Sequence, residues 1–266
     1  MEIVNIWAKY FFKKKISFVP NGKTAISEAL KLLDSKVVAI PTYTCSRVYE
    51  ATINVKCKPI IVDCGLDLQI DINKIPDNVV KWFTSNAMTK DERIINIPLG
   101  VGKDSPEPLC STLTSQMQFS LTSRVNLVYA NWQDYTYDRA VLRNSVGSAN
   151  FSWITLVNSP KPYNDYIKDL SEHSFALCPE GNGVDCYRML ECLYCGCIPI
   201  VLDRIAYEYL EDLPHVRLNS WSELNPDLLK RELTRIEREG LWDNLNKITT
   251  DFWKSEIETA RNLLEA

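Results

Sequence analysis

The residues best suited to chemistry lie between positions 174 and 203, where a glycine-bearing loop joins an apolar run to an amphipathic helix. The loop consists of Glu180, Gly181, Asn182, Gly183 and Val184. Glycines allow the backbone of such a loop to approach a ligand closely. The helix that follows presents free N–H groups and the positive end of its dipole. The segment therefore predicts a phosphate-binding site above a sheet.

One continuous βαβ unit is expected to carry this loop. Asp185 can cap the helix, which should run to about Cys195, and Gly196 can supply the left-handed residue that ends it. Residues 197–202 then read as an apolar strand.

Asp185, Arg188 and Glu191 share one side of the predicted helix. One interpretation is a solvated charged face. The other is a nucleotide site, in which Arg188 pairs with a diphosphate because a guanidinium donates bidentately and keeps its charge. Glu191, one turn deeper, would then accept two ribose hydroxyls.

Residues 173–203 resemble the donor-site signature of exostosin-like glycosyltransferases, which is a Cys-Pro pair, a glycine-bearing loop, an Arg-x-x-Glu helix and Gly-Cys-Ile-Pro. Two upstream pieces are similar to the same family: KWFTSN at 81–86 followed by 95–101, and residues 125–131 with Arg139 eight residues later. Together the similar segments cover residues 80–215.

The resemblance implies an α/β protein of the GT-B class, with two Rossmann-like domains facing across a cleft. It implies an inverting glycosyltransferase that moves a sugar from a UDP-sugar to an oligosaccharide or glycoprotein glycan. Among the sugars that the family transfers, we favour xylose, because a chain this compact leaves little room around the donor. No cofactor is expected, and no metal, because the sequence lacks an Asp-x-Asp motif to hold one. The alternative is a catalytically inactive module that binds a nucleotide or glycan.

By the same resemblance, Asn131 and Arg139 belong to the donor site, Arg139 as a second diphosphate ligand; the alternative for Arg139 is a surface arginine. Tyr207 or Tyr209 could stack on the uracil, although burial against the helix is the simpler interpretation. The expected donor-binding residues are Asn131, Arg139, Glu180, Gly181, Asn182, Gly183, Asp185, Arg188 and Glu191.

Inversion by single displacement requires a general base near the acceptor hydroxyl. Ligands of open α/β sheets collect beyond the carboxyl ends of strands, which favours Asp63 and the following Asp67 and Asp71 as catalytic candidates. Each could instead cap a turn or helix. The two histidines, His173 and His215, are expected to be structural, and Glu180 could contact the sugar.

Residues 18–75 carry a second resemblance, to the opening of the sugar aminotransferases that use pyridoxal phosphate, in FVPNGKTAISEAL, VAIPTYTC and KPIIVD. Those enzymes need a longer chain, a Schiff-base lysine and a partner for the pyridine nitrogen. The similarity is interpreted as convergence or as a borrowed αβ segment that serves the acceptor side.

Composition narrows the class of protein. The chain has 266 residues, 45% of them hydrophobic, a formal charge of −4 and a pI near 5.4, which argues against a nucleic-acid partner. It contains no apolar run of about eighteen residues that could insert stably in a membrane, no secretory signal pattern, and an odd number of cysteines, nine. These features predict a cytoplasmic protein, and the missing Golgi anchor favours a microbial or viral member of the family.

Alternating patterns predict an open, mostly parallel sheet in each half of the chain. Strands are expected at 16–20, 36–41, 58–63, 79–83, 93–98, 125–130, 153–157, 175–177 and 198–202, and helices at 23–33, 46–52, 226–239 and 242–264. A polar linker at 104–123 suggests an acceptor-side domain at 1–120 and a nucleotide-sugar domain at 121–248. In the GT-B pattern that the resemblance implies, residues 249–266 would cross back to the first domain, with Trp253 as an anchor.

Overall fold

The computed structural model describes residues 27, 31, 37–41, 46–62, 81–101, 124 and 126–265. The chain divides into two compact units, Met1–Ile75 and Pro76–Ala266. The predicted strand at 16–20, most of the helix at 23–33 and the linker at 104–123 lie outside the described residues. The domain boundary expected at residue 120 falls in that linker and stays a prediction.

The first unit contains one βαβ element. Strands β1 (Val37–Pro41) and β2 (Lys58–Val62) pair in parallel, and helix α3 (Ser46–Asn54) makes the crossover that parallel strands require. Ala51 of this helix is fully buried and its carbonyl accepts a hydrogen bond from the Ser27 hydroxyl at 3.1 Å. The three elements expected between residues 36 and 63 are confirmed.

The second unit begins with a short parallel pair, β3 (Trp82–Thr84) and β4 (Ile94–Asn96). The buried Asn96 side chain closes the connection between them, because it accepts from the Ala87 amide at 2.9 Å and donates to the Ala87 carbonyl at 3.2 Å. The segment after β3 is therefore fixed next to β4.

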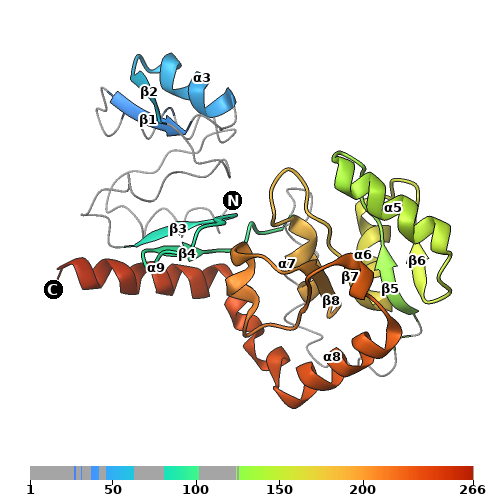
Figure 1. Cartoon of the computed structure of the whole chain (residues 1–266). Helices are drawn as coiled ribbons and strands as arrows, with labels where there is room; N and C mark the ends of the chain where they lie inside the picture. The colour runs from blue at the N-terminus through green and yellow to red at the C-terminus, as the bar shows by residue number, and fades with distance from the viewer. Residues whose placement is uncertain are drawn as a thin grey trace. The chain divides into compact units, whose positions relative to one another are not determined.

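A five-stranded parallel sheet forms the centre of the second unit (Figure 1). Its strands, in spatial order, are β6 (Ile154–Leu156), β5 (Asn126–Ala130), β7 (His173–Leu177), β8 (Ile198–Leu202) and β9 (Val216–Leu218). In chain order this is the 2-1-3-4-5 arrangement of doubly wound folds, whose ligand crevice opens between the first and third strands. Here that switch point lies between β5 and β7.

Helices cover both faces of this sheet, which explains the continuous apolar runs of its strands. On one face lie α6 (Tyr163–Glu172), α7 (Tyr187–Tyr194) and η3 (Ile205–Leu210), packed around Tyr129 and Ala176. On the other lie α5 (Tyr137–Ala149) and α8 (Pro226–Arg238), packed around Val128 and Phe175. The predicted α/β class with parallel sheets is confirmed.

The end of the chain differs from the single helix expected at 242–264. A 3-10 segment, η5 (Leu241–Ile248), is followed by helix α9 (Thr250–Glu265). Thr249 separates them with extended backbone angles, and its hydroxyl accepts from the Phe252 amide at 3.3 Å. A threonine that caps a new helix start explains the interruption. Trp253 is half-buried beside the Phe252 ring, and its role as an anchor stays a prediction.

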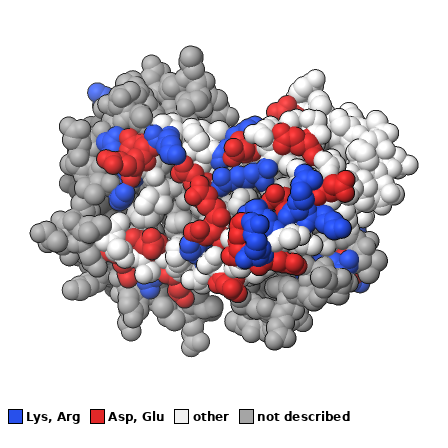
Figure 2. All heavy atoms as spheres, turned by 60° about the horizontal axis from the view of Figure 1, so that its bottom comes forward, with Lys and Arg blue, Asp and Glu red and all other residues white. Residues whose placement is uncertain are grey.

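Acidic and basic side chains are interspersed on the face seen in Figure 2. On α8, for example, Arg235 pairs with Glu232 at 2.8 Å and with Glu239 at 3.0 Å. Within the described ranges, no helix combines the length and apolar character needed to cross a bilayer.

Candidate functional site

A cavity of about 470 Å³ opens at the switch point, beside the carboxyl end of β5 and the first turn of α7. Four of the predicted donor-binding residues line it: Asn131, Arg139, Arg188 and Glu191. Glu180 lines a neighbouring cavity instead. The sequence pattern therefore identified side chains that the fold brings together from β5, α5 and α7.

Arg188 is the second residue of α7 and is half-buried. Its Nε donates to the Tyr166 hydroxyl at 3.2 Å, and its guanidinium lies 5.6 Å from the centre of the Tyr166 ring. Among the described residues, its two terminal nitrogens donate no hydrogen bond, and neither do the backbone N–H groups of Tyr187 and Arg188. The start of α7 thus offers several donors to an anion.

Glu191 is buried, with 6% of its surface exposed. Its Oε2 accepts a hydrogen bond from the Tyr166 hydroxyl at 2.8 Å. Asp185 is buried as well, so the interpretation of this helix side as a solvated charged face is wrong. A buried carboxylate must be held by hydrogen bonds or opposite charges, which makes Glu191 a group of fixed orientation.

Asp185 does not cap α7 as predicted; the N-cap is Cys186, which makes no side-chain cap bond. The Asp185 carboxylate is turned toward the segment after β4 instead. Its Oδ2 accepts from the Leu99 amide at 2.8 Å and from the Tyr209 hydroxyl at 3.0 Å, and its Oδ1 accepts from the Cys186 amide at 2.8 Å. Burial raises the pKa of Asp185 although these hydrogen bonds lower it.

Gly183 allows the loop to approach another part of the protein. A Cβ built there would lie 2.9 Å from Asn86 Oδ1, closer than side chains tolerate. That oxygen accepts the Asp185 amide at 2.6 Å, and Asn86 adopts a left-handed backbone with φ of 64°. The close approach that the glycine permits is thus to Asn86, which holds the loop in place.

Arg139, in the first turn of α5, donates to three backbone carbonyls. Its Nε reaches Glu180 O at 2.8 Å, its Nη2 reaches Pro179 O at 3.0 Å, and its Nη1 reaches Gln133 O at 3.3 Å. Arg139 therefore fixes the start of the glycine loop. Its role as a diphosphate ligand stays a prediction.

Behind the cavity, Asn131 belongs to a polar network that the sequence did not reveal. Asn131 Nδ2 donates to the Tyr129 hydroxyl at 3.0 Å, and that hydroxyl donates to Asp169 at 2.8 Å. Lys161, which lines the cavity, pairs with Asp169 at 2.5 Å. Asp169 and Tyr166 come from α6, which sequence reasoning missed. Apolar or aromatic residues at 163, 166, 167 and 170 were the helical signal.

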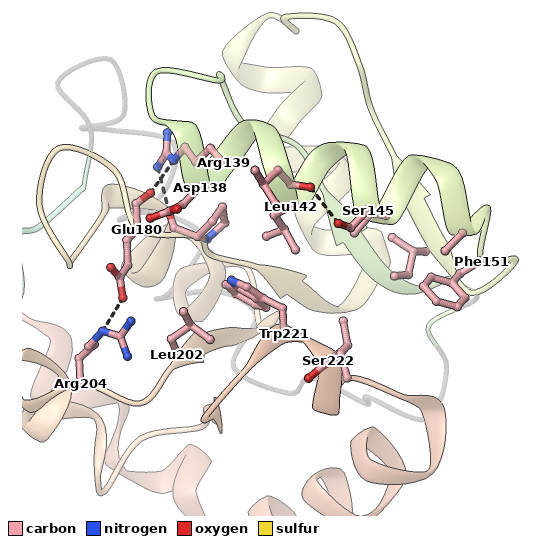
Figure 3. A pocket seen from close by; sticks show the side chains of 16 residues that line it. Asp138, Arg139, Leu142, Ser145, Phe151, Glu180, Leu202, Arg204, Trp221 and Ser222 are labelled. Carbon is pink, nitrogen blue, oxygen red and sulfur yellow. Dashed lines mark hydrogen bonds and ion pairs between the residues drawn. The ribbon is translucent and has the colours of Figure 1, made fainter.

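A second cavity, of about 540 Å³, lies between α5 and η4 (Trp221–Glu223), and Figure 3 shows its lining. In Figure 3, Phe151 stands at one end of the lining and the Glu180–Arg204 pair at the other, with Trp221 between them. Glu180 Oε1 lies 2.8 Å from Arg204 Nε. Arg139 belongs to the lining of both cavities, and its side chain bonds to the start of the glycine loop.

The remaining candidate residues are the aspartates, the tyrosines and the two histidines. Asp63, Asp67 and Asp71 lie outside the described residues. Tyr207 is fully buried and its hydroxyl bonds to the Val184 carbonyl, which agrees with burial rather than stacking on a base.

His173 and His215 are buried as well, and each ring contacts a backbone carbonyl, as a structural role requires. Burial lowers the pKa of His173, and it lowers the pKa of His215 to about 4. Cys192, Cys195 and Cys197 are buried free thiols.

This chain is similar in sequence to known glycosyltransferases. The family described as the RXYLT1 C-terminal domain matches residues 143–241, which include the glycine loop, Arg188 and Glu191. A protein of Arabidopsis thaliana, "Probable glycosyltransferase At3g07620", is 26% identical over 142 residues. The match spans 51% of this chain and 29% of that protein, so less than a third of the relative's length is represented.

Among solved structures, the crystal structure of an alpha1,3-fucosyltransferase aligns with a TM-score of 0.37 and 13% identity, covering 80% of this chain and 68% of that one. The family match includes the glycine loop and the Arg-x-x-Glu helix that carried the resemblance, and the two sequence matches together show that this chain is related to the exostosin-like glycosyltransferases.

Proposed function

We propose that this chain is a glycosyltransferase that moves a sugar from a UDP-sugar to an oligosaccharide or to a glycan of a glycoprotein. The observation that carries the proposal is the cavity at the switch point, which is lined by Tyr187 and Arg188 at the start of α7 and by the buried Glu191, and at which the terminal nitrogens of Arg188 donate no hydrogen bond among the described residues. Relatedness to exostosin-like glycosyltransferases supports it.

The donor would be held by three kinds of group. The terminal nitrogens of Arg188 have the planar geometry that matches diphosphate oxygens. The open N–H groups of α7 add the positive end of a helix dipole. Glu191 can accept hydrogen bonds from the two ribose hydroxyls, since an ionised carboxylate is an acceptor only.

In the transfer, the acceptor oxygen forms a bond to the anomeric carbon as the bond from that carbon to the UDP oxygen breaks. The acceptor's proton passes to a general base, for which Asp63, Asp67 and Asp71 remain the candidates. The leaving diphosphate gains charge, and Arg188 with the α7 amides would stabilise it without a metal ion.

Xylose is the sugar we favour, because the matched domain belongs to an exostosin-like xylosyltransferase family. A pentose lacks the hydroxymethyl group of a hexose, so it also occupies less space beside the diphosphate.

The decisive experiment uses the purified chain, with and without excess EDTA, and a panel of UDP-sugars. We expect UDP release from one sugar nucleotide, faster with a glycan acceptor, and unaffected by the chelator. Tight UDP binding without turnover of any donor would identify the binding module instead. A loss of turnover in EDTA that manganese restores would disprove metal independence, and no UDP binding by calorimetry would overturn the proposed function.

A further inference from the structure

One tyrosine hydroxyl stands between the two ligand groups of the proposed donor site. Tyr166, from α6, donates to Glu191 Oε2 at 2.8 Å and accepts from Arg188 Nε at 3.2 Å. Its ring also lies 5.6 Å from the Arg188 guanidinium carbon and lines the same cavity. No residue of the expected donor set makes both contacts.

The direction of these hydrogen bonds is fixed by chemistry. An arginine can only donate and an ionised carboxylate can only accept, so the single phenolic proton must point to Glu191. Burial raises the pKa of Tyr166 well above its ordinary value, which keeps that proton in place. The hydroxyl therefore links Arg188 and Glu191 in one fixed order.

Arg188 and Glu191 are three residues apart on α7, a spacing at which opposite charges on a helix pair readily. In the described part of the chain they nevertheless form no ion pair with each other. The Tyr166 hydroxyl bonds to the Arg188 Nε and to a Glu191 oxygen, and the terminal Arg188 nitrogens donate no hydrogen bond among the described residues. Loss of that hydroxyl would remove the group that now stands between the two charges.

We propose that Tyr166 is a positioning residue that keeps Arg188 and Glu191 apart, so that one recognises the diphosphate and the other the ribose of the same nucleotide. This role rests on the proposed function of the cavity. It makes selectivity for a ribonucleoside diphosphate depend on a side chain from a different helix.

The test is a binding comparison of UDP, UMP and 2′-deoxy-UDP by calorimetry on Tyr166→Phe, which removes only the hydroxyl. We expect UDP affinity to fall about tenfold, the usual effect of losing hydrogen bonds to charged groups. The preference for UDP over UMP and the preference for UDP over 2′-deoxy-UDP should both shrink. The matched control is Tyr194→Phe, which removes the hydroxyl of a buried tyrosine at the end of α7 that donates to the Ile248 carbonyl at 3.4 Å.

A double variant separates positioning from simple damage. In Tyr166→Phe with Glu191→Gln, no ion pair can form, so the preference for UDP over UMP should return while the preference for the ribose hydroxyl stays lost. If the phenylalanine variant does not fold, Glu191→Gln alone should keep the diphosphate preference and lose the ribose preference.

The outcomes are distinct. Wild-type protein that binds UDP while Tyr166→Phe keeps both preferences overturns this inference and leaves the proposed function standing. A double variant that fails to regain the diphosphate preference also overturns it. Wild-type protein that binds no UDP overturns the proposed function, and this inference with it.

Discussion

The two cavities that meet at Arg139 are both lined by arginines. These arginines differ in whether their guanidinium nitrogens are already bonded within the protein. In the cavity beside α7, the terminal nitrogens of Arg188 have no hydrogen-bond partner among the described residues. In the cavity beside α5, Arg204 is paired with Glu180 at 2.8 Å, and Arg139 itself is bound to backbone carbonyls. An arginine at a cavity wall is a ligand group only if its donors remain available, and that availability distinguishes the two sides.

The largest effect is expected from Arg188→Ala. Because a bidentate, charge-assisted contact contributes about 1.5 to 3 kcal/mol, UDP affinity should fall roughly 10- to 100-fold. The melting temperature should change little, and Arg188→Lys should restore only part of the affinity. Calorimetry measures the UDP affinity of each variant. Unchanged affinity in the alanine variant would show that Arg188 does not bind the nucleotide.

Arg139→Ala should show the opposite profile. Its loss leaves the carbonyls of Pro179 and Glu180 without a donor, so the free energy of unfolding should fall by about 1 to 2 kcal/mol. UDP affinity should fall less than in Arg188→Ala. Urea unfolding and calorimetry on the same samples give both values. A folded, stable Arg139→Ala that loses UDP binding as severely would establish the predicted diphosphate role and break the comparison.

The contact between the glycine loop and Asn86 can be tested by comparing two glycines. Gly183→Ala places a Cβ 2.9 Å from Asn86 Oδ1 and should destabilise the protein by about 1 kcal/mol through overpacking. Gly147→Ala in α5 meets only Leu156 at 3.5 Å, so the better helix propensity of alanine should make it neutral or stabilising. Equal melting temperatures for the two variants would contradict the assigned contact.

The smallest effect is expected from Arg204→Gln in the second cavity. Both partners of its ion pair keep about a third of their side-chain surface exposed, 32% for Arg204 and 29% for Glu180, so stability should change by less than about 1 kcal/mol. UDP affinity should match that of the wild type. A tenfold loss of UDP affinity would show that the nucleotide reaches the second cavity.

Sequence patterns predicted much of this fold, because the residues that make up each pattern are the same neighbouring residues that form the strand or helix. Apolar runs predicted β7 and β8, and Gly196 ends the α7 segment with φ of 66°, as expected. The Arg188 and Glu191 spacing placed both residues in one cavity.

Contacts between residues far apart in the sequence could not be predicted from local patterns. Asp185 bonds to Leu99, which lies 86 positions earlier in the chain, and to Asn86, which lies 99 positions earlier. The expected helix cap was wrong because it considered only the neighbours of Asp185 in the sequence. Tyr166 likewise faces Arg188 only because α6 packs beside α7 on the same face of the sheet.

The hydrogen bonds that join Asp185 to Asn86 and Leu99 also determine which fragments of the protein can keep the glycine loop in place. The matched family segment, residues 143–241, contains the loop but neither of these two partners. A fragment cut to that segment would also lack β5, which pairs with both β6 and β7 in the sheet. Even a longer fragment that begins just before β5 would leave the Asp185 carboxylate without the Leu99 amide and the Asp185 amide without the Asn86 oxygen. In such a fragment the sheet would keep its strands, but the loop amides would exchange with solvent faster than in the whole chain. The smallest portion that preserves the loop geometry therefore begins before β3, far upstream of the segment that sequence comparison marks as the domain.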